Sequence, residues 1–202
     1  MSGAASGPMT WADVAALARL TLSDPQAGAR AVMALDVPRE HNFTLFLLAI
    51  TSSGAMAQLD LLISRPDQPE GAIALSGFTI AAGVGATLLL LAGLIQWLGR
   101  LAGGTGQLTD VLRLMIWLQL LLVALQVVQT LLMLIAPVLA SVVAIAGLAL
   151  SLWLLTHFIA AAHGFSSPWK VFGAMVAVGF GLSLLLSILL TALIGAGAPG
   201  GA

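Results

Sequence analysis

The feature that most constrains this chain is an apolar stretch that covers most of its second half. From Leu114 to Trp169 the chain runs 56 residues without an Asp, Glu, Lys or Arg, and Lys170 is the single formal charge after Arg113. A soluble protein does not present such a surface to water, whereas a hydrocarbon core of about 30 Å needs only about 20 apolar residues per helix. The sequence therefore predicts an integral membrane protein.

The composition of the whole chain agrees with this prediction. Charged residues make up 7% of the sequence and the mean hydropathy is +1.09, whereas an ordinary soluble domain is about 25% charged. A net charge of −1 gives no electrostatic reason to expect nucleic acid as a partner. The chain has no cysteine, which excludes disulfides and thiolate metal sites. We expect no metal and no cofactor.

The N-terminal segment, residues 9–41, is predicted to form two short amphipathic helices. Thr10 and Asp13 have the spacing of a capping box at the start of the first helix. Asp24 followed by Pro25 indicates a second helix start, because proline lacks the N–H that the first helical turn leaves unbonded. Both helices are too short to span a bilayer. Two positions stay open for them, a cytoplasmic cap and an interfacial position among the lipid headgroups.

Five apolar segments between residues 42 and 195 are long enough to cross a membrane. Prolines, glycines and charges separate them and predict loops at 64–70, 100–109, 137 and 163–168. The fold class that follows is all-α, a polytopic domain of five transmembrane helices preceded by the short amphipathic segment. The predicted spans are 42–63, 72–98, 111–135, 138–161 and 169–194, with a disordered tail at 1–8 and a second tail at 196–202.

The distribution of Lys and Arg predicts the orientation of these spans. Six of the seven basic residues fall in segments on one side of the five-span layout, and Arg65 alone falls on the other side. Because short cytoplasmic loops carry the excess of positive charge, we expect a cytoplasmic N-terminus and a C-terminus outside. The richness in Ala, Leu and Gly suggests a bacterial source, and hence the inner membrane.

Two of the predicted spans carry small residues at every fourth position. This spacing lets helix backbones approach closely, which matters in lipid because no hydrophobic drive holds helices together. We expect these faces to pack spans of one chain against each other, and a contact between two copies is the alternative. The two sets are Gly77, Ala81 and Gly85 in the second span and Gly173, Ala177 and Gly181 in the fifth.

A polar face is predicted on the third span, where Gln119, Gln126 and Thr130 lie on one side of the helix. The fourth span adds His157. Amides in hydrocarbon cost free energy unless they are paired, so this face is expected to point inward and form interhelical hydrogen bonds. The alternative is a hydrophilic pathway, which usually also contains an ionisable group.

The remaining polar residues do not assemble a catalytic or metal site. His157 and His163 are six residues apart, so one helical face cannot present both to a metal. We expect His163 to be an interfacial turn residue and Asp60 to be a capped carboxylate at the outer membrane edge. Asp110 and Arg113 are three residues apart, which favours a local ion pair. No nucleophile–base pair is present, and no catalytic residue is predicted.

The glycine-rich loop at residues 103–106 invites comparison with a phosphate-binding loop. It lacks the Lys-Ser/Thr pair that follows a Walker loop, and no strand precedes it. We therefore expect no nucleotide binding.

The same loop carries a family resemblance. The stretch GRLAGGTG at residues 99–106, running into LMIWLQ at 114–119, resembles bacterial members of the Yip family of Rab-GTPase-interacting membrane proteins. In those proteins a Gly-Gly-x-Gly turn precedes a helix rich in large apolar residues. The segment LTLSDP at 20–25, with Ala29 and Arg30, is similar to their amphipathic entry segment. The resemblance covers residues 10–195 and implies a layout of five helices with the N-terminus inside and the C-terminus outside.

The resemblance implies a membrane role and supplies no catalytic residues. Eukaryotic members are associated with vesicle traffic and membrane shaping through prenylated Rab partners, and residues 1–41 lack a counterpart of their long cytoplasmic region. The hypothesis is a non-catalytic inner-membrane protein that acts in membrane organisation or as a subunit of a membrane complex. Its partners would be the lipid bilayer and other membrane proteins or a second copy. The alternative is a small transporter or channel lined by polar residues of the third and fourth spans.

Overall fold

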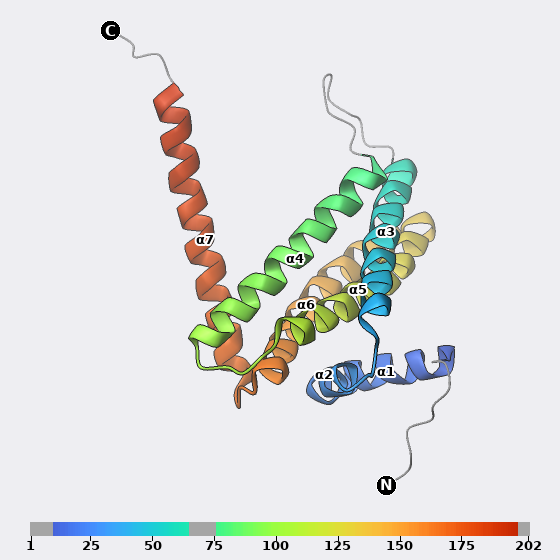
Figure 1. The fold of residues 1–202 in the computed structure, drawn as a ribbon. Helices are drawn as coiled ribbons and strands as arrows, with labels where there is room; N and C mark the ends of the chain where they lie inside the picture. Colours follow the sequence, from blue (N-terminus) through green and yellow to red (C-terminus); the bar gives the residue numbers. More distant parts are fainter. Residues whose placement is uncertain (1–9, 65–75, 198–202) are drawn as a thin grey trace.

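The computed structural model describes residues 10–64 and 76–197. The predicted tail at 1–8, most of the predicted loop at 64–70 and most of the predicted tail at 196–202 lie outside these described residues. Within them the chain forms seven α-helices and no strand (Figure 1). The helices are α1 (Trp11–Ser23), α2 (Pro25–Met33), α3 (Arg39–Ser64), α4 (Gly77–Leu101), α5 (Leu108–Ile135), α6 (Pro137–His163) and α7 (Pro168–Gly197).

The five long helices, α3 to α7, confirm the predicted fold class. Each contains an apolar segment of 24 to 28 residues that is long enough to cross a membrane. At 1.5 Å per residue such a segment measures about 36–42 Å, which exceeds the hydrocarbon thickness of about 30 Å and leaves room for tilt. The second span begins at Gly77 in the described chain, and the predicted residues 72–75 lie outside the described part.

The two short N-terminal helices begin where the sequence indicates. The backbone N–H of Thr10 donates to Asp13 Oδ2 at 2.8 Å and the N–H of Asp13 donates to Thr10 Oγ1 at 3.3 Å, which completes the predicted capping box. Thr10 Oγ1 also donates to Asp13 Oδ2 at 2.7 Å, and this side-chain bond, followed by the main-chain bond from the Thr10 N–H, lowers the pKa of the Asp13 carboxyl. At the second helix, Asp24 Oδ1 accepts from the N–H of Ala27 at 2.9 Å and Pro25 occupies the first turn.

Helices α1 and α2 lie across the end of the bundle where α3 begins (Figure 1). Helix α2 packs against both α5 and α6. The indole Nε1 of Trp117 on α5 donates to Thr21 Oγ1 at 3.1 Å, and Thr21 is fully buried. Gly28 makes room for this contact, since a Cβ there would lie 2.6 Å from Thr21 Oγ1. The amphipathic pair is therefore fastened to the membrane helices.

Arg113 holds the connection between α2 and α3 in place. The sequence suggests an ion pair with Asp110, but the Arg113 guanidinium donates instead to the main-chain carbonyls of Met33, Leu35 and Val37 at 3.5, 3.4 and 3.1 Å. Met33 is the last residue of α2, and Leu35 and Val37 lie in the connection after it, where carbonyls have no intrahelical N–H partner. The prediction of a local ion pair missed this competing set of acceptors, which lie far away in the sequence.

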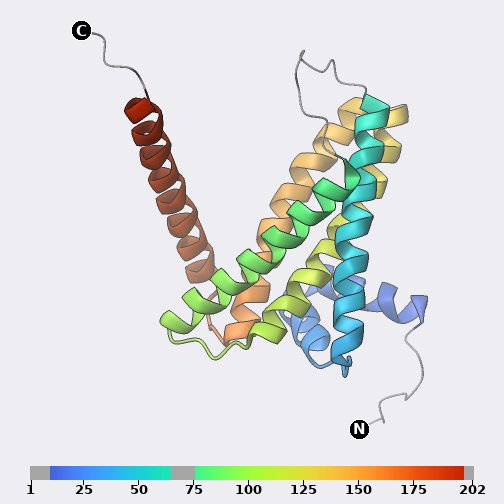
Figure 2. The ribbon, with the colours of Figure 1, turned by 45° about the horizontal axis from the view of Figure 1, so that its top comes forward.

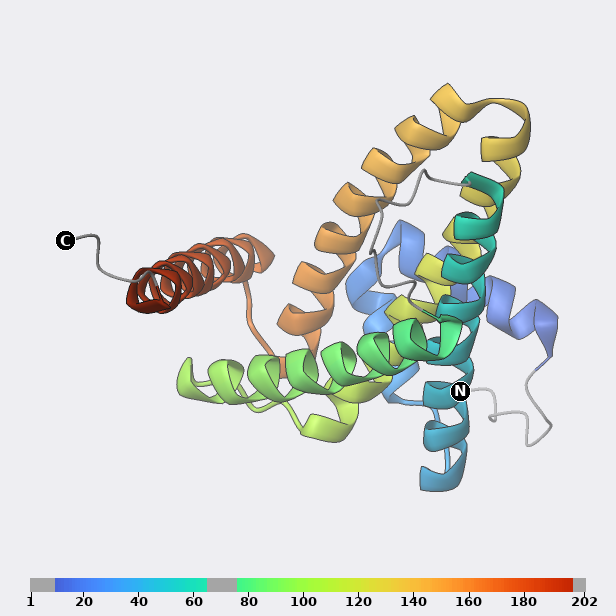
Figure 3. The same ribbon diagram turned by 90° about the horizontal axis from the view of Figure 1, so that it is seen from above.

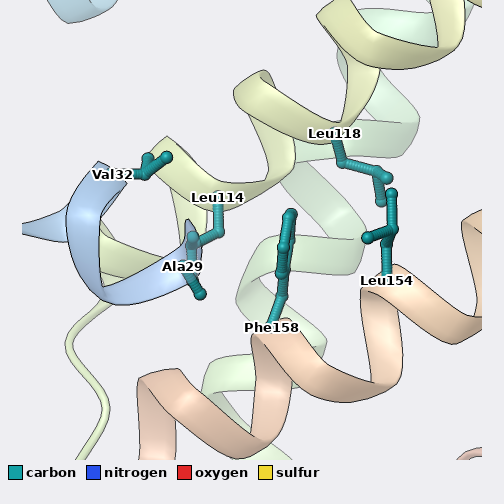
Figure 4. Close-up of a cluster of buried hydrophobic side chains, with 6 residues drawn as sticks. All are labelled: Ala29, Val32, Leu114, Leu118, Leu154 and Phe158. Atoms are coloured by element: carbon teal, nitrogen blue, oxygen red, sulfur yellow. The ribbon is translucent and has the colours of Figure 1, made fainter. Parts of the chain in front are cut away.

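The largest group of buried side chains joins the N-terminal helices to the bundle (Figure 4). Figure 4 shows the ring of Phe158 between side chains of α2 and α5. A second buried cluster lies between α4 and α5 around Leu88, Ala92, Val111 and Met115. The first cluster consists of Ala29 and Val32 from α2, Leu114 and Leu118 from α5, and Leu154 and Phe158 from α6.

Helix α7 stands apart from this packed body. Its main contact is with α6, and Figures 2 and 3 show it diverging from the bundle after the turn that follows α6. Between Phe172 and Ala192 every residue except Met175 is exposed. The other four long helices form a continuous set of contacts, α4 with α3 and α5, α3 with α5, and α5 with α6.

Candidate functional site

The polar face predicted on the third span lies against α3. Gln119 Nε2 donates to Ser53 Oγ at 2.8 Å, and Gln126 Nε2 donates to Asp60 Oδ2 at 2.9 Å. Thr130 Oγ1 lies 2.5 Å from Asp60 Oδ1. The five side chains form a polar layer between α3 and α5, which we call the α3–α5 polar layer. The face points into the bundle, and each amide has a partner on the neighbouring helix.

Sequence reasoning missed Asp60 and Ser53 as members of this layer. Asp60 was expected to be a capped carboxylate at the outer membrane edge, and it also bonds across the bundle, because two side chains of α5 hold its two oxygens. The spacing of polar residues along the two helices could have indicated this contact. Ser53 and Asp60 are seven residues apart, as are Gln119 and Gln126, and both pairs are offset by the same 66 positions. Two parallel helices with matching seven-residue polar spacing place their polar groups in register.

His157 lies outside the α3–α5 polar layer. Its Nδ1 is 2.8 Å from the main-chain oxygen of Trp153, one turn earlier in α6, and its ring meets the Trp153 ring edge-on with centroids 5.2 Å apart. The ring borders a shallow open hollow together with Asp24, Gln26 and Ser166. The predicted polar set is therefore divided, with Gln119, Gln126 and Thr130 in one place and His157 in another.

His163 occupies a socket of glycines. It is the last residue of α6, next to Gly164, and it is 2% exposed, so its side chain is buried within the protein. A Cβ on Gly104 would lie 2.6 Å from His163 Cβ, a Cβ on Gly106 would lie 2.8 Å from Cδ2, and one on Gly99 would overlap the ring. The ring also stacks on Phe165 with centroids 5.6 Å apart. The glycine-rich loop therefore receives an imidazole ring, which explains why residues with no Cβ occupy these positions.

Main-chain hydrogen bonds also hold the segments around this socket together. The N–H of Thr105 donates to the His163 carbonyl at 3.2 Å, and Gly164 ends α6 with a φ of 72° in the left-handed region that glycine favours. His163 Nδ1 lies 3.2 Å from the Ile159 carbonyl, while Nε2 is buried without a partner among the described residues. The socket joins the loop between α4 and α5 to the end of α6.

The two small-residue faces have different surroundings. On α4, a Cβ on Gly85 would approach Ile50 Cδ1 at 3.3 Å, and Ala81 lies against Gly54 of α3. On α7, a Cβ on Gly173 or Gly181 would meet nothing within 4 Å, and Ala177 is exposed. The α4 face therefore contacts α3, and the α7 face contacts nothing among the described residues. Within residues 10–64 and 76–197, the small-residue face of α4 is covered and that of α7 is open.

An open cavity of about 280 Å³ borders the α3–α5 polar layer. It lies between α3, α5 and α6, whose ends are seen from above in Figure 3. Asp60, Gln126, Gln129 and Ser151 contribute its polar wall, and Leu122, Leu125 and Leu148 contribute much of its apolar wall. Among the described residues no group of three or more His, Cys, Asp or Glu is arranged to hold a metal ion.

Comparison with known proteins identifies one family. The family model of the Yip1 domain matches residues 19–190, from the end of α1 through most of α7. This match confirms the resemblance that the glycine-rich loop suggests. No curated protein and no solved structure matches the chain.

Proposed function

The chain belongs to the Yip1-domain family, and from this membership and its five membrane helices we propose a non-catalytic role in membrane organisation or complex assembly. In this role the chain acts as a subunit or assembly partner for other membrane proteins, or for a second copy of itself. It is a multi-pass membrane protein, and its contact with the lipid bilayer follows from that.

The observation that carries the proposal is the position of α7. Helices associate in lipid through close packing, and small residues at every fourth position favour it. Helix α7 presents such a face at Gly173, Ala177 and Gly181, with open space in front of the two glycines. An exposed face with this spacing supports docking of a helix from another chain. A helix that served only to complete this bundle would have its small residues turned toward α6.

The exposed side of α1 supports a role at the membrane surface. Trp11 is 88% exposed, and Leu22, which lies eleven residues later on the same face of the helix, is exposed as well. Helix α1 is tied to α5 through the buried Thr21, while Trp11 and Leu22 remain exposed. A tryptophan and a leucine on one exposed face of a short helix beside membrane spans match an interfacial amphipathic helix. Of the two positions left open by the sequence, we favour this interfacial one.

We propose the bacterial inner membrane as the location, with the N-terminus in the cytoplasm and the C-terminus outside. The support is the six-to-one distribution of Lys and Arg over the two sides. Reporter fusions at position 5 and in the loop at Gly103 should report the cytoplasm, and fusions at Pro66 and Ala202 should report the outside. A cytoplasmic signal from Ala202 would contradict the orientation.

Purification of the full chain in mild detergent tests the assembly role. We expect a stoichiometric partner, or a second copy, to copurify with the wild type and to be lost from Gly181→Leu. Gly83→Leu is the matched control, because Gly83 is also a helical glycine with nothing within 4 Å, but lies on α4. A wild type that purifies alone, or a Gly181→Leu variant that keeps its partner, would contradict the proposal.

The alternative, a transporter or channel lined by Gln119, Gln126 and His157, has less support. The two amides each donate to a side chain of α3. His157 lies beside Trp153 on α6 and borders a different hollow. A continuous path would need these three groups to border one cavity, and reconstituted vesicles would then show a flux that depends on them.

A further inference from the structure

A largely apolar groove lies between α3, α4 and α5, near the ends at which α3 and α5 begin. Its volume is about 290 Å³, close to the lower end of the roughly 300–1,000 Å³ that small-molecule pockets occupy. Helices α3 and α4 are in contact at Gly54 and Ala81, and they diverge toward the beginning of α3 (Figures 1 and 2). The groove is lined by residues of both diverging helices and of α5.

The groove lies within the membrane-spanning segments and is open at the surface of the bundle. Its described lining residues belong to the candidate spans Glu40–Ile63, Gly77–Leu101 and Leu108–Ile135. Phe43 and Leu89, which line it from α3 and α4, are both exposed. In a bilayer the surroundings of these two side chains are lipid, so phospholipids are the molecules with direct access to the groove.

The lining of the groove is polar at one end and apolar beyond it. Asn42 and Thr109 lie in the first turns of α3 and α5, and Arg113 follows one turn after Thr109. Phe46 and Ile116 continue the lining farther along the same two helices. A phospholipid has the same order, with a charged headgroup at the membrane surface and apolar chains beneath it. Basic pockets between membrane helices bind the headgroups of anionic lipids in this way.

The positive charge of Arg113 is held by neutral groups. Its guanidinium donates through Nη1 and Nη2 to three main-chain carbonyls between residues 33 and 37. A guanidinium has five N–H donors, so these three bonds leave two donors free. One of them is Nε, which is buried without a partner among the described residues. Arginine therefore keeps both charge and hydrogen-bonding capacity for an anion at this end of the groove.

No acidic side chain competes for this position among the described residues that line the groove. Arg113 is the single charged residue among them, and neither Glu40 nor Asp110 is part of the lining. The charge of the groove is therefore complementary to an anion. Phosphate oxygens match the planar fork of a guanidinium, and a phospholipid supplies such oxygens next to an apolar chain.

From this arrangement we propose that the groove binds one anionic phospholipid, with its phosphate at Arg113 and an acyl chain between α3 and α4. The site goes beyond the assembly role proposed above and does not depend on a partner of α7. Arg113 also holds the connection between α2 and α3. The lipid would therefore contact the residue that ties the N-terminal helices to the bundle.

Native mass spectrometry of the full chain, stripped of lipid in mild detergent, tests the proposal. The protein is titrated with phosphatidylglycerol or with phosphatidylcholine that has the same acyl chains. We expect the first phosphatidylglycerol to bind about tenfold more tightly, the scale of one hydrogen bond to a charged group. Inorganic phosphate in excess should not displace this lipid, because free phosphate has no chain to occupy the apolar part of the groove.

Two variants, each with a matched control, locate the bound lipid. Arg113→Gln should lose the preference for phosphatidylglycerol, and Arg100→Gln should keep it, because Arg100 is an exposed arginine in the last turn of α4 that does not line the groove. Leu89→Trp fills the groove from α4 and should weaken binding of phosphatidylglycerol by about tenfold or more. Leu90→Trp should bind as the wild type does, because Leu90 is exposed and lies outside the lining. Circular dichroism checks that each variant is folded.

Three results would overturn the proposal. The first is a wild type that binds both lipids equally, and the second is displacement of phosphatidylglycerol by inorganic phosphate. The third is wild-type binding of phosphatidylglycerol by folded Arg113→Gln or by Leu89→Trp. If Arg113→Gln does not fold, the comparison of Leu89→Trp with Leu90→Trp decides, because both leave the guanidinium in place.

Discussion

Helices α4 and α7 carry the same spacing of small residues and have opposite environments. On α4 the small residues lie against α3, and on α7 they face open space. Both helices are apolar enough to cross the membrane, so hydrophobicity does not separate them. The comparison shows that small residues at every fourth position give a helix the capacity for close contact. The spacing alone does not identify the partner.

What separates the two helices is the surface opposite them. Helix α3 presents Gly54 to α4, so that Gly77 and Ala81 meet a second residue without a large side chain. Close approach of two backbones needs small residues on both sides of the contact. Helix α7 meets no such opposing glycine among the described residues. Its partner is therefore expected on another chain.

The largest expected effect is at Gly54, where α3 and α4 are closest. A Cβ there would overlap the Gly77 carbonyl and lie 2.8 Å from Ala81 Cβ, and a backbone atom cannot move aside as a side chain can. Gly54→Leu should lower stability in detergent by about 3 kcal/mol, the upper end for overpacking of a core. Thermal unfolding followed by circular dichroism measures the loss. An unchanged midpoint would mean that α4 does not pack on α3 at this point.

A smaller effect is expected one turn further along the same contact. At Gly85 the nearest atoms are Ile50 Cδ1 and Phe46 Cζ, at 3.3 and 3.4 Å. Both are the far ends of side chains that can rotate, so the cost of a larger residue is reduced. Gly85→Leu should cost about 1–2 kcal/mol by the same measurement. A loss equal to that of Gly54→Leu would contradict the difference between backbone and side-chain neighbours.

A substitution in the α3–α5 polar layer tests the contribution of a hydrogen bond, whereas the glycine variants test close packing. Replacing Gln126 by Leu removes one donor to Asp60, which keeps Thr130 and the adjoining cavity. Interhelical hydrogen bonds in membranes average about 0.6 kcal/mol, and we expect Gln126→Leu to lower stability by about that amount. If the layer instead lines a path for solute, the same variant should abolish flux in reconstituted vesicles and keep its stability. That outcome would favour the transporter.

Much of the fold was predictable because membrane helices depend on local composition. The long apolar segments, the capping box at Thr10 and the helix start at Asp24 and Pro25 each depend on residues within one turn or one span. The structure confirms all of them. In lipid, backbone N–H and C=O groups must bond to each other within the protein. An apolar segment long enough to cross the membrane is therefore expected to form a helix.

The site was harder to predict because it depends on contacts between distant segments. Asp60 meets Gln126 across 66 residues, and Arg113 meets carbonyls near residue 35 across about 80. The glycines of the loop at 103–106 indicated a close approach, but the ring that fills the space belongs to His163, at the end of another helix. The periodicity of a single helix identifies which of its faces carries polar or small residues. It does not tell which residues of another helix lie opposite that face.

The smallest expected effect on stability is at Gly181, on the open face of α7. A Cβ there meets nothing within 4 Å, so a leucine displaces no atom of the isolated chain. Gly181→Leu should therefore keep the wild-type midpoint to within about 0.5 kcal/mol, as surface substitutions do. Gly83→Leu on α4 should behave in the same way. The two variants should differ in partner binding. Gly181→Leu should lose the copurifying partner, because it fills a face that we expect a second helix to occupy, and Gly83→Leu should keep it. If Gly181→Leu instead destabilised the purified monomer as much as Gly85→Leu, α7 would have to pack on its own bundle. The contrast between α4 and α7 would then disappear.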